Sequence, residues 1–258
     1  MNKLKEIYEY RLMIRSLVKR DLRGKYKGSV LGFMWTFVNP LLQLLVYNMV
    51  FSIIMKAGVD KFYLYLFVGL IPWLFFSAAI TGGSTCIIAQ KDLIKKIRFP
   101  REIIPISFVT SQFVNMILSF IVVILVSVIS GVRPTIGGIL CLPVIMLVEY
   151  LMALGIALIS SSLTVYFRDL EHILAIIAMA WLYATPICYP EEMVPAEYLP
   201  IYRLNPVTPI VNAYRDVLYW GRTPDLRTLL LAVLIGLVTV VLGILIFGRL
   251  QRRFAEEL

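Results

Sequence analysis

Residues that build metal sites and disulfide frameworks are scarce in this sequence. It has one histidine, His172, and three cysteines, Cys86, Cys141 and Cys188, none of them in a C-x-x-C pair. A zinc site or a disulfide framework needs several such residues at close spacing. We therefore expect no metal site in the chain and interpret the cysteines as small packing residues.

Catalytic motifs are missing as well. The Gly24-Lys25 pair is followed by Tyr26 where a phosphate-binding P-loop needs Ser or Thr, and Lys19 stands where the first loop glycine would be. Neither G-x-S-x-G nor H-E-x-x-H occurs. We expect a chain that binds no cofactor itself and is not an enzyme.

Charge is also in short supply, whereas long apolar runs are abundant. Charged residues make up 16% of the chain and hydrophobic residues 60%, with a mean hydropathy of +0.84. A soluble chain could not bury so much apolar surface, so the composition indicates an all-α polytopic membrane protein with a single domain over residues 1–258. A spanning helix needs about 20 mostly apolar residues. Six transmembrane helices are predicted, over residues 31–55, 62–89, 104–131, 136–167, 172–189 and 227–248.

Lysine and arginine are distributed unevenly between the two sides of such a bundle. Of the 25 basic residues, 18 lie on one side, in segments 1–30, 90–101, 168–171 and 249–258. Cytoplasmic loops carry the excess of basic residues, so both termini are predicted to be cytoplasmic. This bias also explains the net charge of +9. We expect no binding of nucleic acid, because no soluble domain could form a binding face.

The first thirty residues have the pattern of a helix that lies in the membrane interface. Basic residues recur every four positions beside a narrow apolar stripe: Arg11, Arg15, Lys19 and Arg23 beside Tyr10, Ile14, Leu17 and Val18. A helix of this kind lies along the inner leaflet with its apolar stripe in the lipid. The alternative is a basic helix that is merely solvated.

Segment 190–226, on the opposite side, is rich in proline. It holds six of the 13 prolines of the chain, too many for a spanning helix. Thr208 followed by Pro209 predicts the start of a helix, and Gly221 predicts a stop. We expect a re-entrant segment of short helices that dip into the outer face of the membrane.

Glu149 is the one acidic residue deep inside a predicted crossing. An ionised side chain there costs on the order of 3 kcal/mol, so it should face protein or water rather than lipid. Two interpretations remain open. Glu149 either lines a polar pathway or relays a proton, or it is a hydrogen-bonded carboxyl that holds two helices together.

Four stretches of the chain together resemble a known family. They are SVLGFMWTFVNPLLQLLVYNMVFS at 29–52, LIKKIRFPREIIP at 93–105, TVYFRDLEHIL at 164–174 and LNPVTPIVNAYRDVLYWG at 204–221. In this order and spacing they resemble the membrane subunit of ABC-2 type exporters of polysaccharides and polyol phosphates. This family moves precursors of O-antigen, wall teichoic acid or capsule, and the resemblance covers nearly the whole chain.

The resemblance implies an assembly and a cargo. The chain would form a homodimer in the bacterial cytoplasmic (inner) membrane, with two copies of a separate ATP-binding subunit on the cytoplasmic face. ATP and Mg would be bound by that partner subunit. The cargo in this family is a glycan carried on a polyprenyl diphosphate. Segment 190–226 resembles the external gate helices that close the path between transport events.

The resemblance also assigns the cytoplasmic loop 90–104 and the turn at 168–172 to the surface that couples to the ATPase. Pro100 and Pro105 bracket a short rigid element, and the cluster of Lys and Arg in the loop can form charge-assisted contacts with an acidic partner. A simpler alternative is that these charges fix topology and hold anionic headgroups. The candidate coupling residues are Lys91, Lys95, Lys96, Arg98, Arg101, Glu102, Arg168, Asp169, Glu171 and His172.

Two further sets of residues follow from the implied cargo. Candidates for attracting the lipid diphosphate are Arg11, Arg15, Lys19, Arg20 and Arg23. Candidates for lining a glycan path between the two copies are Trp35, Tyr47, Trp73, Trp181 and Tyr183. For any one of these aromatic residues, the alternative is a place in the interfacial belt or in helix packing.

Other classes of protein fit part of the pattern. An ABC-2 permease for a drug or an ordinary lipid shares the plan of six crossings. An ion-coupled secondary transporter usually has inverted repeats and several intramembrane charges, whereas this sequence shows no repeat and only Glu149. A passive membrane scaffold would leave the loop at 90–105 without a task beyond topology.

Overall fold

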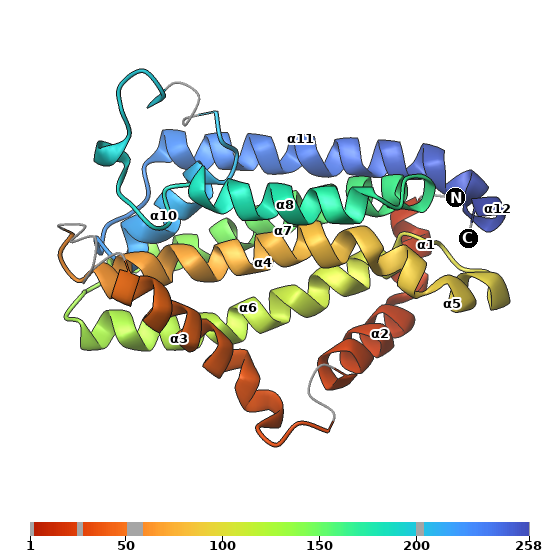
Figure 1. Cartoon of the computed structure of the whole chain (residues 1–258), viewed down its shortest axis with the longest axis horizontal. Coiled ribbons are helices and arrows are strands. Elements are labelled where there is room, and N and C mark those ends of the chain that lie inside the picture. The colour runs from red at the N-terminus through yellow and green to blue at the C-terminus, as the bar shows by residue number, and fades with distance from the viewer. Residues whose placement is uncertain (1–2, 25–27, 51–58, 200–203, 258) are drawn as a thin grey trace.

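The computed structural model describes residues 3–24, 28–50, 59–199 and 204–257, and every regular element in these residues is a helix (Figure 1). The N-terminal region forms α1 (Lys3–Glu9) and α2 (Arg11–Gly24). The bundle consists of α3 (Trp35–Asn48), α4 (Phe62–Ala89), α6 (Ile103–Ile129), α7 (Ile136–Tyr166), α8 (Leu170–Tyr183) and α11 (Leu226–Leu250). Short helices connect or end these elements: η1 (Gly32–Met34), α5 (Lys91–Lys96), η3 (Glu191–Met193), α10 (Thr208–Leu218), η4 (Gln251–Arg253) and α12 (Phe254–Glu257).

Four of the predicted crossings are helices that are long and apolar enough to span a membrane. They are α4, α6, α7 and α11, the last extended through η4 to Arg253. The 14 residues of α8 rise about 21 Å, less than the hydrocarbon thickness of about 30 Å. The predicted crossing at 31–55 falls partly outside the described residues, which contain α3. The all-α membrane fold is confirmed, and the count of six crossings stays a prediction.

The core of the bundle lies around α4. In its most apolar window 78% of the residues are buried inside the chain, against 28%, 39% and 22% in α6, α7 and α11. The exposed side chains of α11 are mainly leucine, isoleucine and valine, which suits contact with lipid. The chain therefore surrounds one buried helix with helices that each keep an apolar outer face.

Helices α7 and α11 pack with their backbones in close contact. A Cβ atom at Gly155 would lie 2.4 Å from the carbonyl oxygen of Thr239, and one at Gly243 would lie 2.6 Å from the carbonyl oxygen of Gly155. Small residues at helix contacts allow this approach in membranes, where van der Waals packing is a main source of helix association. Of this close-packed pair, α7 is the helix that packs against α4.

Charged connections and both termini lie at the same end of the bundle. Figure 1 shows α5, the start of α8, α12 and the two chain ends at the right, while α10 and the start of α11 lie toward the left. We call these the α5 end and the α10 end. This arrangement agrees with both termini on one side of the membrane, and their cytoplasmic location stays a prediction.

The predicted N-terminal helix is present as two pieces, α1 and α2, with Tyr10 between them. Helix α2 packs against α6. Its predicted apolar stripe turns toward the protein, with Leu17 buried and Ile14 and Val18 half-buried. Its basic residues are exposed. The amphipathic character of the helix is thus visible, and its location in the membrane interface stays a prediction.

The proline-rich segment contains a helix that enters the bundle. Helix α10 begins at Thr208 with proline in its first turn, as predicted, and Gly221 beyond its end has φ +72°. Ten of its eleven residues are buried, against α4, α7 and α11 among others. Helix α10 is therefore part of the bundle rather than of a surface loop, and the role of the segment as a gate stays a prediction.

Candidate functional site

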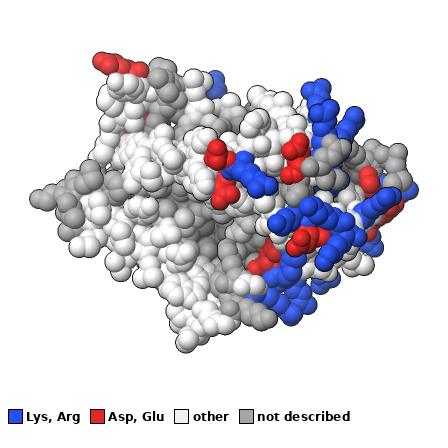
Figure 2. Space-filling view, turned by 45° about the vertical axis from the view of Figure 1, so that its right-hand side comes forward, with Lys and Arg blue, Asp and Glu red and all other residues white. Residues whose placement is uncertain are grey.

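The α5 end carries most of the exposed charge. Figure 2 shows Lys and Arg gathered there, with Asp and Glu among them, while most of the remaining visible surface is uncharged. Four predicted coupling residues from loop 90–104 are exposed, and so are the four from the turn at 168–172. We call these eight residues the coupling surface: Lys91, Lys95, Lys96, Arg98, Arg168, Asp169, Glu171 and His172.

The geometry of α5 explains why its lysines point outward. Leu93 and Ile94 are half-buried, which leaves the charged side chains on the opposite face. The helix ends before Ile97, whose backbone is extended at φ −130° and ψ 138°. Pro100 then disfavours helical geometry in the residue before it. The result is a short helix, α5, followed by a segment at 97–100 without regular secondary structure.

Two apolar side chains are exposed within the coupling surface. Ile97 is 53% exposed and Phe167 is 68% exposed. Exposed apolar groups surrounded by charges are a composition that suits a protein contact, because the apolar groups supply buried area and the charges supply orientation. The α5 end can therefore dock a partner through both charge and apolar contact.

Arg101 and Glu102, the other two predicted coupling residues of the loop, turn toward the chain itself. The Nη1 atom of Arg101 donates to the backbone oxygen of Gln251, and its guanidinium lies 5.8 Å from the ring centroid of Phe254. The side chain of Gln251 donates to Oε1 of Glu102 at 2.7 Å. Glu102 is only 9% exposed. These two residues hold the C-terminal segment against the loop.

We call η4 and α12 together the C-terminal brace. Besides the loop, the brace region contacts the end of α7, where the hydroxyl of Tyr166 donates to the backbone oxygen of Leu250 at 2.8 Å. Phe254 is fully buried, with ring centroids at 6.3 Å from Tyr166 and 5.5 Å from Phe247. The brace thus joins the loop at 90–104 to the helix that leads into the turn at 168–172. The sequence interpretation missed it, and its only local signal is one aromatic residue in a charged tail.

A second feature lies on α2. A cavity of about 460 Å³ and another of about 760 Å³ adjoin this helix, and Arg20 and Gly24 line both. The larger one, which we call the basic cavity, lies between α2 and η1 and is lined by Lys19, Arg20 and Arg23 with Phe33. All five predicted diphosphate-attracting residues are exposed, and three of them line this cavity.

The two remaining basic residues lie further toward the start of α2. Arg11 donates to the backbone oxygen of Tyr8 at 3.3 Å and lies 4.6 Å from the centroid of that ring. Arg15 is exposed and does not line the basic cavity. The helix therefore presents a row of basic residues that ends at the basic cavity.

The five aromatic residues predicted to line a glycan path differ in exposure, and two of them, Trp73 and Trp181, pack on the ring of Phe76 with centroids at 5.7 and 5.3 Å. Trp35 and Tyr183 are 39% and 52% exposed, and Tyr47 is half-buried. Trp73 is only 3% exposed, and the indole of Trp181 donates to Oδ1 of Asn205 at 3.0 Å. Trp73 and Trp181 therefore pack within the chain. Their role in a path, and that of the other three, stays a prediction.

Glu149 is buried and held by a residue of α10. Its Oε2 atom accepts a hydrogen bond from the hydroxyl of Tyr214 at 2.7 Å, and the two residues are 1% and 0% exposed. The tyrosine ring packs on Phe120, with centroids at 4.9 Å. The contact joins α7 to α10, which agrees with the structural interpretation of Glu149, and the polar-pathway alternative stays open.

Arg215, the residue after Tyr214, is also buried, with 3% exposure. Its guanidinium lies 3.5 Å from the centroid of the Tyr65 ring, and its Nη2 atom donates to the backbone oxygen of Ile187 at 3.0 Å. A buried guanidinium needs such partners because its desolvation is costly. Arg215 thus joins α10 to α4 and to the segment after α8, a contact that the sequence interpretation did not foresee.

Polar contacts also order the α10 end. Asp216 and Arg222 form an ion pair at 2.6 Å, and the hydroxyl of Tyr219 donates to the backbone oxygen of Asp60 at 2.5 Å. Burial raises the pKa of Tyr219, the nearby Asp60 adds to this rise, and Arg215 opposes it. The phenol therefore keeps the proton that it donates.

These features define a class of protein. Long apolar helices around a buried centre, with exposed charge gathered at one end and a short helix inserted at the other, are the features of an integral membrane protein. Among the described residues, no group of His, Cys, Asp or Glu could hold a metal ion.

Comparison with known proteins gives the family. Residues 13–219 match the ABC-2 type transporter family, and the chain belongs to this family. It is 34% identical over 257 residues to the O-antigen export system permease protein RfbA of Myxococcus xanthus, covering 99% of this chain and 98% of that relative. A protein of the same name from Klebsiella pneumoniae is 31% identical, with 94% and 93% covered. The polysialic acid transport protein KpsM of Escherichia coli is 22% identical, with 92% and 93% covered.

Proposed function

We propose that the chain is the transmembrane subunit of an ATP-driven exporter that moves a polyprenyl-diphosphate-linked glycan across the bacterial inner membrane. Two copies would form the membrane part of the transporter. Two copies of a separate ATP-binding subunit would bind at the α5 end, where ATP and Mg would be held by that partner. This chain itself performs no catalysis.

The single observation that carries the proposal is the coupling surface. An exposed basic helix, α5, lies at the same end of the bundle as the exposed turn at 168–172, and two apolar side chains, Ile97 and Phe167, are exposed between these charges. Membership of the ABC-2 type transporter family supports an ATP-binding partner for this surface. The named relatives, permeases of O-antigen export and a polysialic acid transport protein, support a glycan as cargo.

The mechanism follows from the connections of this surface. ATP binding closes the partner subunits, and their motion enters the chain through α5 and the turn at 168–172. Near these elements, Gln251 of the C-terminal brace contacts Glu102 of the loop, and Tyr166, just before the turn, contacts Leu250 at the end of α11. The helices then move as packed units and admit the lipid head and glycan.

The test reverses three charges of the coupling surface, with Lys95→Glu, Lys96→Glu and Arg98→Glu combined. We expect loss of glycan export and of ATP hydrolysis stimulated by this chain, because the substitutions oppose an acidic partner surface. The matched control reverses Arg133 and Arg227, which are exposed at the other end of the bundle. Normal export and stimulation in the triple variant, with its topology verified, would contradict the proposal.

The cargo needs a separate measurement. Inner-membrane vesicles with the exporter and ATP are assayed for transfer of glycan, of phospholipid and of a drug-like amine. Transfer of phospholipid or drug in place of glycan would assign the chain to the other branch of ABC-2 permeases. Transport that persists without the ATP-binding subunit would instead indicate an ion-coupled transporter.

A further inference from the structure

Helix α6 carries a row of polar side chains that the function described so far does not use. Ser107, Ser111, Asn115 and Ser119 recur every four residues and therefore share one face of the helix. This face looks toward α2 and α3, both of which pack against α6. Polar side chains in a membrane helix need partners, so such a row marks either a helix contact or a binding site.

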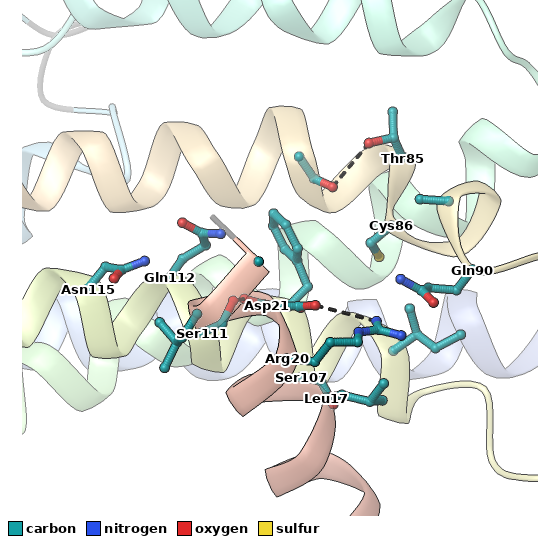
Figure 3. Close-up of a pocket in the computed structure, with 16 residues that line it drawn as sticks. Leu17, Arg20, Asp21, Thr85, Cys86, Gln90, Ser107, Ser111, Gln112 and Asn115 are labelled. Carbon is teal, nitrogen blue, oxygen red and sulfur yellow. Dashed lines mark hydrogen bonds and ion pairs between the residues drawn. The ribbon is translucent and has the colours of Figure 1, made fainter. Parts of the chain in front are cut away.

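The row lines two adjoining cavities. The first, which we call the polar cavity, has a volume of about 460 Å³ and lies between α2, α4 and α6 (Figure 3). Arg20, Asp21 and Gln90 lie toward one end of it, and Gln112 and Asn115 toward the other. A second cavity of about 230 Å³ continues between α3, α4 and α6, and Gln112 and Asn115 line both. The size of the polar cavity suits a small-molecule ligand, for which cavities of about 300–1,000 Å³ are typical.

The hydrogen-bonding groups of the polar cavity favour a ligand rich in hydroxyls. The hydroxyls of Ser107 and Ser111 donate to the backbone oxygens of Ile103 and Phe108 at 2.6 and 2.7 Å. Their protons are therefore occupied, and their oxygens can accept a hydrogen bond. Asn115 adds the two N–H donors of its amide and a carbonyl acceptor, because both polar atoms of its side chain are buried without a hydrogen-bond partner. Buried groups in that state are rare and costly, and a hydroxyl satisfies either one.

Charge separates the polar cavity from its neighbour. Arg20 and Asp21 form an ion pair at 3.4 Å at its edge, so the lining carries no net charge. The basic cavity carries three basic residues and no acid. Arg20 and Gly24 line both. The last turn of α2 thus has a cationic cavity on one side and a neutral, hydrogen-bonding cavity on the other.

We propose that the polar cavity binds the first sugar of the lipid-linked cargo while the diphosphate lies in the basic cavity. This inference rests on the proposed function and adds to it a site at which the transporter recognises the first sugar of its cargo. A sugar offers both donor and acceptor hydroxyls, which match Asn115 and the two serines. A diphosphate is the anion that the basic residues attract. An ordinary lipid such as phosphatidylglycerol also has hydroxyls, and the experiment separates the two sources.

The experiment measures binding to the transporter, purified with its ATP-binding partner and reconstituted in nanodiscs of phosphatidylethanolamine. The two probes are polyprenyl diphosphate and the same lipid carrying one N-acetylhexosamine. The variants are Asn115→Leu, which keeps the size of the side chain without its polar atoms, and Ser111→Ala. The control is Ser127→Ala, because Ser127 is another buried serine of α6 whose hydroxyl donates to the backbone oxygen of Leu218, outside both cavities.

We expect the wild-type transporter to bind the sugar-bearing lipid about fivefold to tenfold more tightly than the bare diphosphate, the effect of one or two hydrogen bonds. Asn115→Leu and Ser111→Ala should each reduce this preference while leaving the affinity for the bare diphosphate unchanged. Ser127→Ala should keep it. If Asn115→Leu does not fold, the smaller Ser111→Ala change decides the question.

Three results would overturn the inference. Equal wild-type affinity for both probes, or a preference that survives in both cavity variants, would place the sugar elsewhere and leave the proposed function intact. Displacement of the sugar-bearing lipid by phosphatidylglycerol, with the same dependence on Asn115, would assign the cavity to ordinary lipid. Failure of the wild-type transporter to bind either probe would remove both this inference and the proposed cargo.

Discussion

The C-terminal brace gives the sharpest prediction, which concerns Gln251. Replacing Gln251 by Ala removes the amide that donates to Oε1 of Glu102 at 2.7 Å, at a residue that is only 9% exposed. A hydrogen bond to a charged group contributes about 1.5–3 kcal/mol. At about 1.4 kcal/mol for each factor of ten, the equilibrium for opening of the brace should rise about tenfold to a hundredfold.

Hydrogen exchange measured by mass spectrometry reads this opening directly. Amides of the brace and of the last turn of α11 should exchange faster in Gln251→Ala by the factor given above, while those of α4 keep the wild-type rate. The matched control is Arg252→Gln, one residue along, because Arg252 is exposed. The brace also joins the two parts of the coupling surface, so we expect ATP hydrolysis to continue while export falls.

The two readouts test different parts of the reasoning. Unchanged exchange in the brace would show that the Gln251–Glu102 contact does not stabilise it. Faster exchange with normal export would show that the Gln251–Glu102 contact stabilises the brace but that export does not depend on this stability. Only faster exchange together with lost export supports the brace as a mechanical link.

Three further predictions follow from other contacts. Tyr214→Phe should destabilise the protein by about 1 kcal/mol, read as a lower thermal midpoint in detergent, because the carboxyl of Glu149 loses its 2.7 Å donor; an unchanged midpoint would show that this bond contributes nothing. Gly155→Ala should force α7 and α11 apart, since its Cβ would lie 2.4 Å from the backbone oxygen of Thr239. A pair of cysteines introduced across the two helices measures their spacing, and disulfide formation as efficient as without the substitution would contradict this prediction. Ile97→Asp should weaken binding of the ATP-binding subunit at least about tenfold in a pull-down titration without changing thermal stability, because the side chain is 53% exposed; equal binding would exclude it from the interface.

The sequence predicts those helices whose apolar runs are long and uninterrupted. For α4, α6, α7 and α11 the run and the helix nearly coincide. The run at 172–189 is equally apolar, but the helix ends at Tyr183 and residues 184–189 form turns around Pro186. Hydropathy alone cannot detect this end, because residues 185–188 remain buried and most of them are apolar.

The candidate site could be predicted only where it depends on local pattern. The exposed lysines of α5 follow from their spacing beside Leu93 and Ile94. The inward turn of Arg101 and Glu102 does not, because Gln251 is about 150 residues away in the chain. The polar row on α6 is visible in the sequence at four-residue spacing, yet serine is common in membrane helices, so its meaning depends on the cavities beside it.

The burial of α10 sets an order of events during biosynthesis. This helix carries Arg215 and Asp216, which could not enter the hydrocarbon layer alone, and it packs against α11, which is made after it. While the ribosome is still synthesising α11, the surface of α10 that will contact it has no cover. A chain truncated before Leu226 would keep the partners of both charges, Tyr65, Ile187 and Arg222, but would leave that surface of α10 uncovered, a defect that the quality-control proteases of the membrane can recognise.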